Sequence, residues 1–480
     1  MTDGRRALYR LATSRYISLS VQVATTIVIA RLLTPSEIGV FSIGAAFVGL
    51  GHLLRDFGSG TFIIQEKELN LDKIRAAFSV TLLLGWSIAA ALLVAAPFAA
   101  DFYNQEGIQD VLSLLSVNFF LLPFGSIPLA YAQRELNFTP SSIATVGSTL
   151  VATAVSIYLA YTGHSYMSLA WGAVCGTITT VALVTLFRPK GLPFVLPGRY
   201  GIRRVLAFGS RISAITVLDK LSALTPELVL GKTQDLHAVG LFSRTQGTAN
   251  IFNQFVMMII TPIVTPLFAE RFRSGGAIRP IFLHGLFCVT GLAWAFSANL
   301  AVLAQPFVLA LYGDQWESIV PLIQIWSVSL ILGYMTSLVD QVLVGTGNIN
   351  RLMRYAVFIN TYQIFGFFVA GLFGIEAILV VIVFAPILRL LWLWRDIKHI
   401  CGINGKDLVE VVKVSLIPAI LSAAMAGLAV QLTARYFTTS SLILLATGAT
   451  FSALVWLLLI WRRRHPLWEE GLEVLRRLPR

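Results

Sequence analysis

Fourteen long apolar runs are the feature that most constrains how this chain can fold. An α-helix of about 20 apolar residues spans the hydrocarbon core of a bilayer, where every backbone polar group must be satisfied internally. Only 12% of the 480 residues are Asp, Glu, Lys or Arg, about half the share in soluble domains. The sequence therefore predicts an all-α integral membrane protein. The runs fall at 11–31, 38–54, 76–97, 109–128, 142–161, 165–187, 205–230, 237–262, 280–304, 318–344, 355–373, 375–394, 414–433 and 438–461.

Positive charge alternates from one loop to the next. If the N-terminus is cytoplasmic, 31 of the 36 Lys and Arg residues fall in cytoplasmic segments, including the group from Arg389 to Lys413. Outer loops hold only Arg31, Lys232 and Arg435. Cytoplasmic loops carry such an excess, so we predict about fourteen spans with both termini inside. The formal net charge of +12 then points to the inner membrane surface and an anionic substrate rather than to nucleic acid.

The two halves of the chain are related in sequence. VIARLLTPSEIGVFS at 28–42 matches VLGKTQDLHAVGLFS at 229–243 with a constant offset of 201 residues. Two later matches keep the same order, between 74–78 and 278–282 and between 97–103 and 306–312. Six spans separate the repeats, so both have the same orientation. The identical pairs in the first match are Val28 and Val229, Gly39 and Gly240, Phe41 and Phe242, and Ser42 and Ser243.

This repeat predicts two pseudo-symmetric six-helix lobes followed by two further spans. The N-lobe is 1–187, a basic cytoplasmic linker occupies 188–204, and the C-lobe is 205–395. The last two spans lie within 396–461, and 462–480 is a basic cytoplasmic tail. Parallel repeats around a central cavity are typical of transporters in which rocking of the halves gives alternating access.

Several charges lie inside predicted spans, where a charge near the bilayer centre costs about 2.5–3.5 kcal/mol on insertion scales. Arg244 is the strongest substrate-site candidate, because the repeat has Ile43 at the equivalent position. Lys220 and Arg15 are further candidates for binding an anionic substrate. Glu227 and Asp219 are candidates for charge balance or ion coupling. The structural alternatives are an ion pair, an interhelical hydrogen bond, or snorkelling of the long side chains to the headgroups.

Four charged residues at the inner ends of spans are candidates for a cytoplasmic gate. They are Arg55 and Asp56 after the second span, and Arg134 and Glu135 between the fourth and fifth. Each adjacent pair could equally form a simple ion pair. Asp340, near the end of the tenth span, is interpreted as a polar residue at a helix end.

No catalytic or metal-binding set is apparent in the sequence. The six histidines and three cysteines are scattered without metal-ligand spacing, and no Walker A motif is present. We therefore predict no enzyme activity, no metal and no bound cofactor. A coupling ion, H⁺ or Na⁺, or the membrane potential would reset a transport cycle, and the sequence does not distinguish among them.

Three stretches resemble a known family: LRDFGSGTFIIQEKELN at 54–70, AQRELNF at 132–138, and ELVLGKTQDLHAVGLFSRTQGTANIFNQ at 227–254. They are similar to the polysaccharide transporter family, the Wzx-type flippases of the MOP superfamily, and most similar to its exopolysaccharide, colanic-acid-like branch. The resemblance covers most of the chain in the same order. It implies the MATE-like fold with fourteen helices in two lobes.

The resemblance also implies an activity. Members flip undecaprenyl-pyrophosphate-linked oligosaccharide across the bacterial cytoplasmic membrane, with the pyrophosphate and sugars in a cationic central cavity. The family pattern matches Arg244, Glu227 and the loop at 133–138, whereas Lys232 stands where the family often has Arg. Implied partners are the lipid-linked substrate, the bilayer, and a polysaccharide polymerase with glycosyltransferases.

Three alternatives remain open at this point. A lipid II flippase is the nearest sibling. A MATE-like cation-coupled drug or metabolite antiporter would favour an acidic cavity, whereas the deep charges here are mixed. An integral glycosyltransferase or polymerase would need carboxylates or a large outer catalytic loop, and the predicted outer loops are short.

Overall fold

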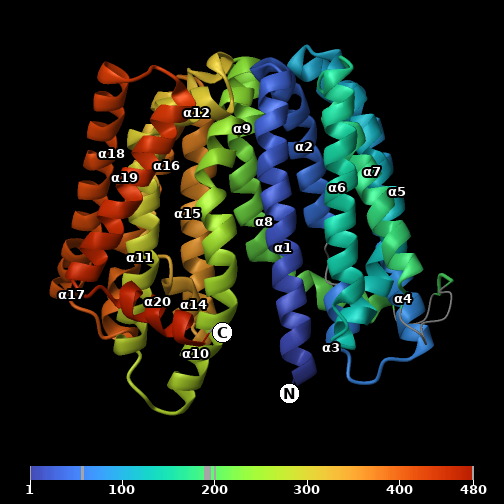
Figure 1. Ribbon diagram of the computed structural model, residues 1–480. Helices are drawn as coiled ribbons and strands as arrows, with labels where there is room; N and C mark the ends of the chain where they lie inside the picture. Colours follow the sequence, from blue (N-terminus) through green and yellow to red (C-terminus); the bar gives the residue numbers. More distant parts are fainter. Residues whose placement is uncertain (1, 56–58, 189–195, 199–201, 478–480) are drawn as a thin grey trace. The chain divides into compact units, whose positions relative to one another are not determined.

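The computed structural model describes residues 2–55, 59–188, 196–198 and 202–477, which form helices joined by short connections (Figure 1). The chain divides into two compact units, Met1–Ser243 and Arg244–Arg480. Predicted spans and helices coincide closely in both units, because a long apolar run has no other way to satisfy its backbone in lipid.

The first unit is built from a layer of long helices. α6 packs against α7 and α1, α4 packs against α5, and α2 lies between α5 and α8. The short α3 lies against α4, α5 and α8. The helices are α1 (Thr2–Leu32), α2 (Pro35–Arg55), α3 (Ser59–Gln65), α4 (Leu71–Tyr103), α5 (Glu106–Arg134), α6 (Thr139–Tyr161), α7 (Met167–Leu186), α8 (Ile202–Thr233) and the first part of α9 (Leu236–Ala249).

The second unit is centred on α11, which packs against α13 and α18. α15 packs against α16, and α18 against α19. Its helices are α10 (Met258–Arg273), α11 (Arg279–Val302), α12 (Ala304–Leu311), α13 (Ile319–Tyr334), α14 (Val339–Gly345), α15 (Ile349–Gly371), α16 (Ile375–Ile400), α17 (Gly405–Val411), α18 (Ile417–Tyr436), α19 (Ser441–Arg462) and α20 (Pro466–Arg477). Two π-helical turns, Asn253–Met257 and Val412–Leu416, and a 3-10 turn, Asp314–Trp316, complete it.

Each predicted span lies on one helix or on consecutive helical segments. Within the described residues, ten helical stretches are long and apolar enough to cross a membrane, so the count of fourteen spans stays a prediction. Two predicted spans are interrupted well inside their bounds. The span at 237–262 is interrupted by a π-helical turn, and the span at 318–344 is divided between α13 and α14. Helices also form in segments that were predicted only as loops or tail, namely α3, α12, α17 and α20.

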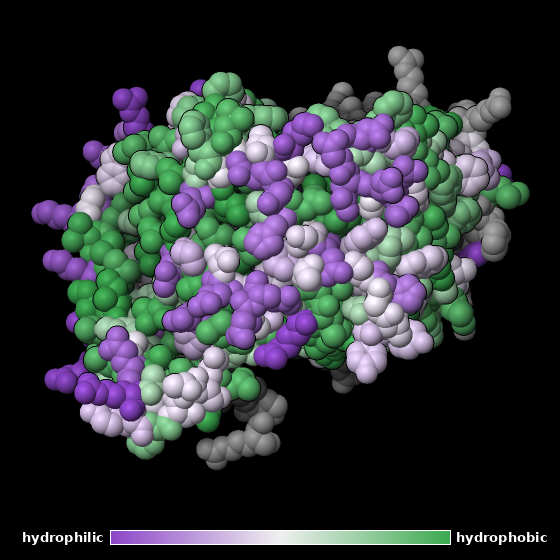
Figure 2. Space-filling model, turned by 90° about the horizontal axis from the view of Figure 1, so that it is seen from above, coloured by the Kyte–Doolittle hydropathy of each residue, from purple (hydrophilic) through white to green (hydrophobic). Residues whose placement is uncertain are grey.

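Large apolar side chains cover the flanks of the helices. Phe365 and Phe373 on and after α15 are 72% and 78% exposed, and Leu391 on α16 is 69% exposed. Figure 2, which looks onto the helix ends, shows hydrophilic residues gathered there and hydrophobic residues around much of the sides. Large exposed apolar surface requires a partner, and lipid supplies it. The protein is therefore a multi-pass membrane protein.

The sequence repeat lies at a close helix crossing inside the first unit. A Cβ added at Gly39 of α2 would lie 1.9 Å from the carbonyl oxygen of Leu236, and one added at Gly240 of α9 would lie 1.8 Å from that of Pro35. Pro35 and Leu236 are themselves 201 positions apart, so the two contacts are reciprocal. Between them Ser42 Oγ donates to Ser243 Oγ at 2.9 Å. The first turns of α2 and α9 thus cross about a local pseudo-twofold axis.

Candidate functional site

Glu227 is a buried carboxylic acid on α8, with 8% of its surface exposed. The preceding Pro226 has no N–H and so removes one helical hydrogen bond at this point of α8. The Ser243 hydroxyl on α9 hydrogen-bonds to the Glu227 carboxyl group, and Ser42 on α2 in turn donates to Ser243. A hydrogen-bonded series of Glu227, Ser243 and Ser42 therefore joins three helices of the first unit.

Arg244 lies on α9 within the second unit and packs on two aromatic rings. Its guanidinium carbon is 5.4 Å from the ring centre of Tyr312 and 5.1 Å from that of Trp316. Both rings are buried, and the Tyr312 hydroxyl is 2.9 Å from Thr248 Oγ1 on α9. Such cation–π packing holds a guanidinium in place and leaves its positive charge intact. This aromatic support for Arg244 was not evident from the sequence.

The remaining predicted cations and Asp219 lie on exposed surfaces. Arg15 on α1 and both Asp219 and Lys220 on α8 are exposed. Lys220 is seven residues before Glu227, a rise of about 10 Å along the helix. Among the described residues, Lys220 and Glu227 form no ion pair with each other. Glu227 instead has Ser243 as its polar partner.

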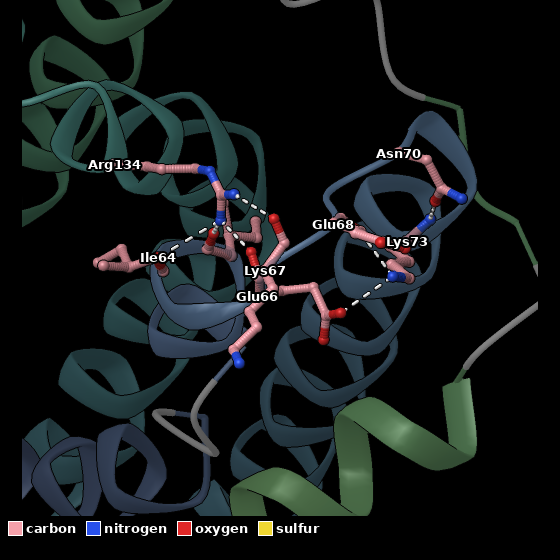
Figure 3. Close-up of polar contacts among 8 residues, drawn as sticks. Ile64, Glu66, Lys67, Glu68, Asn70, Lys73 and Arg134 are labelled. Atoms are coloured by element: carbon pink, nitrogen blue, oxygen red, sulfur yellow. Dashed lines mark hydrogen bonds and ion pairs between the residues drawn. The ribbon is translucent and has the colours of Figure 1, made fainter.

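Arg134 at the end of α5 binds the backbone at the end of α3 (Figure 3). Its Nη1 donates to the carbonyl oxygens of Ile63 at 2.7 Å, Glu66 at 2.6 Å and Ile64 at 3.4 Å. Its Nη2 donates to Lys67 O at 3.4 Å. The last carbonyls of a helix have no partner within the helix, so Arg134 supplies the cap that α3 lacks.

The other gate candidates are placed as follows. Arg55 is the last residue of α2, and Asp56 lies outside the described residues. No ion pair joins Arg134 to Glu135 in the described part of the chain. The simple pairing that the sequence left open for these two residues is therefore wrong, because Arg134 reaches across to α3 instead.

The segment after α3 is fixed by Lys73 (Figure 3). Lys73 Nζ forms an ion pair with Glu66 Oε1 at 2.9 Å and donates to the Glu68 carbonyl oxygen. Asn70 caps α4, because its Oδ1 accepts from the Lys73 backbone N–H at 3.0 Å. Together with the Arg134 contacts, these interactions fix the segment 59–73, which comprises α3, its connection to α4 and the first residues of α4.

We expect Arg134→Ala to destabilise this segment by about 1–3 kcal/mol, because two part-buried and two exposed carbonyls lose a charged donor. The readout is thermal unfolding of the purified protein in lipid nanodiscs. Lys67→Ala is the matched control, since it removes a positive charge from the same loop while only the Lys67 backbone oxygen takes part in the cap. Equal unfolding temperatures for both variants would contradict the capping role.

The second unit contains an ion pair between Arg389 on α16 and Asp340 on α14, which the sequence does not predict. Arg389 Nη2 lies 2.8 Å from Asp340 Oδ1 and 3.2 Å from the Thr336 carbonyl oxygen. The Arg389 guanidinium also packs on the ring of Tyr355 at 5.3 Å. The charge count grouped Arg389 with the cytoplasmic segment although it lies within the predicted span 375–394, and the structure places it inside α16. Asp340 is thus the partner of a helix-embedded arginine rather than only a polar residue at a helix end.

No metal-ligand cluster was found where the structure describes the chain. A search of those residues finds no group of three or more His, Cys, Asp or Glu side chains that could hold a metal ion. The three cysteines are free thiols far apart in sequence.

Comparison with known proteins decides the family. Residues 28–321, more than half of the chain, match the family model described as polysaccharide biosynthesis protein. The chain belongs to this family. One relative is the lipopolysaccharide biosynthesis protein WzxC of Escherichia coli (strain K12), 23% identical over 72% of this chain and 71% of WzxC. Another is the teichuronic acid biosynthesis protein TuaB of Bacillus subtilis (strain 168), 19% identical over 92% of this chain and 91% of TuaB.

Solved structures share the fold. The inward closed form of the lipid II flippase MurJ superposes with a TM-score of 0.72 at 13% identity, covering 96% of this chain and 98% of MurJ. An inward-facing multidrug resistance MATE transporter of the MOP superfamily gives 0.64 at 14% identity, covering 83% of this chain and 100% of that one. The predicted membership of the polysaccharide family is confirmed, and the all-α membrane fold matches that of a MOP superfamily transporter.

Proposed function

We propose that this family member flips undecaprenyl-pyrophosphate-linked oligosaccharide repeat units from the inner to the outer leaflet of a bacterial cytoplasmic membrane. The units would serve exopolysaccharide, capsule or O-antigen synthesis. The observation that carries the proposal is the match of residues 28–321 to the polysaccharide biosynthesis family, in a chain with the fold of lipid-headgroup and drug transporters.

The physical problem is the polar headgroup. A glycan with two phosphates cannot cross about 30 Å of hydrocarbon unless protein groups replace its water. Arg244, Lys220 and Arg15 are proposed to compensate the pyrophosphate, and a guanidinium suits phosphate because its donors bind two oxygens in parallel. The rings of Tyr312 and Trp316 would hold Arg244 in place for this role, and their packing against its guanidinium supports this.

Alternating access is proposed to come from rocking of the two lobes, 1–187 and 205–395, about the linker 188–204. Glu227, with Asp219, would balance charge in the empty cavity or couple to H⁺ or Na⁺. The burial of Glu227 and its contact with Ser243 support this role, because a buried carboxyl group is sensitive to its proton or counter-ion. The membrane potential is the other source of energy.

The proposed topology places both termini, the linker and the residues near Arg55 and Arg134 in the cytoplasm. The loops at 98–110 and 231–236 then face outward. Arg55, Asp56, Arg134 and Glu135 are proposed to border the cytoplasmic entrance, where the capping of α3 by Arg134 would fix its rim. A polymerase and glycosyltransferases are the proposed partners.

A second candidate is a lipid II flippase, favoured by the TM-score of 0.72 with MurJ over nearly the whole of both chains. The two candidates differ in the lipid-linked sugar that accumulates when the protein is absent. Lipid analysis of a deletion strain separates them, since a block in lipid II transport stops growth, whereas a block in polymer export leaves viable cells without the polymer.

We expect Arg244→Ala to reduce polymer export by about tenfold or more in a complemented deletion strain, since a charge-assisted hydrogen bond to phosphate contributes about 1.5–3 kcal/mol. The lipid-linked repeat unit would accumulate in the same cells. Arg435→Ala is the matched control, because Arg435 also packs on a tyrosine ring, that of Tyr436 at 5.6 Å, but lies in a predicted outer loop. If both variants insert into the membrane and export polymer equally well, Arg244 is not part of the substrate site.

A further inference from the structure

A polar cavity of about 510 Å³ lies in the first unit, and none of Arg244, Lys220 and Arg15 lines it. Its walls come from the start of α2, the end of α4, the start of α7 and the α8–α9 connection. The volume is in the range of pockets that hold small ligands. The chain segments that line it are those predicted to face outward, so the proposed topology places the cavity at the outer surface.

The walls of the cavity are fixed by helix-capping contacts. Thr34 and Glu37 form a reciprocal cap at the start of α2, because the Thr34 N–H donates to Glu37 Oε2 at 2.7 Å and the Glu37 N–H donates to Thr34 Oγ1. Asp235 caps α9 by accepting from the Ala238 N–H at 2.7 Å. Asn104 ends α4 in the left-handed conformation, with φ of 52°. The cavity is therefore preformed rather than a gap between loose loops.

The chemistry of the lining suits sugar rings. Phe102 is 52% exposed and offers an aromatic surface to the C–H face of a pyranose. The side chains of Gln105 and His237 form no hydrogen bond with the described residues, although both line the cavity. An amide and an imidazole can each donate and accept, which is the combination that hydroxyl groups require. A mainly polar pocket lined by Phe102, Tyr103 and Tyr166 among its polar residues is poorly suited to a lipid tail.

The charged residues that line the cavity disfavour the binding of a phosphate group. Two carboxylates, Glu37 and Asp235, line the cavity with a single lysine, Lys232. The Lys232 ammonium is already engaged, since it donates to the Phe102 carbonyl oxygen at 2.7 Å and lies 4.3 Å from the centre of the Phe102 ring. A pyrophosphate would meet net negative charge here, whereas neutral sugar hydroxyls can donate to the same carboxylates.

We propose that this cavity is a second binding site, specific for uncharged sugar residues of the translocated headgroup, and separate from the residues proposed to bind pyrophosphate. The proposal rests on the proposed flippase function and topology. A site of this kind would hold the distal sugars as the headgroup leaves the protein, so that the glycan does not return. It assigns a role to Phe102, Gln105 and His237, none of which was singled out in the sequence.

The test uses the full-length protein in lipid nanodiscs and an array of neutral bacterial oligosaccharides that carry no lipid and no phosphate. We expect at least one array glycan to bind, and the combined variant Phe102→Leu, Gln105→Ala, His237→Ala to weaken its binding by about tenfold or more. Tyr161→Leu is the matched control, since Tyr161 is 79% exposed at the end of α6 and does not line the cavity. Inorganic pyrophosphate is expected not to displace the glycan.

Three results would overturn the site: no array glycan bound, equal affinity of the combined variant and the wild type, or displacement of the glycan by pyrophosphate. Failure of the flippase proposal is seen separately. If a deletion strain accumulates no lipid-linked oligosaccharide, the flippase proposal is wrong. Glycan binding in nanodiscs would still test the cavity independently. If the deletion strain accumulates the lipid-linked oligosaccharide but glycan binding does not depend on the cavity residues, the flippase proposal stands and only the sugar-site proposal is wrong.

Discussion

Gly39→Ala is expected to abolish the folded protein in the membrane. The added Cβ would lie 1.9 Å from the carbonyl oxygen of Leu236, far inside van der Waals contact, and the obstacle is backbone rather than a movable side chain. Overpacking of a well-packed site costs about 1–3 kcal/mol, and more where the surroundings cannot move. Gly240→Ala should act alike, because its Cβ would lie 1.8 Å from the Pro35 carbonyl oxygen. The measurement is the yield of monodisperse protein after extraction, with its thermal unfolding.

Gly247→Ala is the control for both glycine variants. Gly247 lies in the same helix as Gly240, and a Cβ there meets nothing within 4 Å. Alanine is favoured over glycine in helices by up to about 1 kcal/mol, so this variant should be neutral or slightly more stable. Normal yield and unfolding of Gly39→Ala would show that α2 and α9 do not cross as closely as described.

Asp340→Ala is expected to destabilise the protein by about 3 kcal/mol, because it leaves Arg389 without its carboxylate inside a membrane helix. Removing one partner of a buried ion pair costs about 3–5 kcal/mol. We place this case at the lower end, since the Asp340 side chain is 37% exposed. The Thr336 carbonyl and the Tyr355 ring would still contact Arg389. Thermal unfolding in nanodiscs gives the measurement.

A double variant separates the ion pair from simple packing. Replacing both partners, Asp340→Leu with Arg389→Leu, leaves no unpaired charge, and such replacements of whole pairs are often neutral. The double variant should therefore be more stable than Asp340→Ala alone. A double variant that is less stable than the single one would mean that α14 and α16 depend on side-chain shape here, not on charge pairing.

Apolar run length predicted the helices well but not their interruptions. The runs at 237–262 and 318–344 were each predicted to form a single span. The first contains a π-helical turn, and in the second the helix is interrupted after Tyr334. Proline does not mark either break: Pro262 comes after the π-helical turn, and 335–338 contains no proline. Such breaks depend on how neighbouring helices satisfy freed backbone groups, which hydropathy does not encode. The short helices α3 and α12 were not predicted because neither is long enough to form an apolar run.

The sequence identified several important residues but not the residues that they contact. Gly39 and Gly240 were visible as an identical pair, but the reason for two glycines is a close backbone contact between residues about 200 positions apart. Arg134 was singled out for its charge, whereas its partners are backbone carbonyls that carry no sequence signal. Arg389 was counted with a cytoplasmic segment although it lies within the predicted span 375–394, and its partner Asp340 is 49 positions away. Long-range partners of charged residues therefore required coordinates.

The most direct test of the central claim is transbilayer movement of lipid-linked oligosaccharide in proteoliposomes containing only this protein. An impermeant glycosidase or lectin added outside reports which headgroups are accessible. Headgroups initially protected in the inner leaflet should become accessible in proteoliposomes of the wild-type protein, and more slowly with Arg244→Ala. A protected fraction that stays the same as in protein-free liposomes, under an imposed potential and an imposed H⁺ or Na⁺ gradient, would contradict the account.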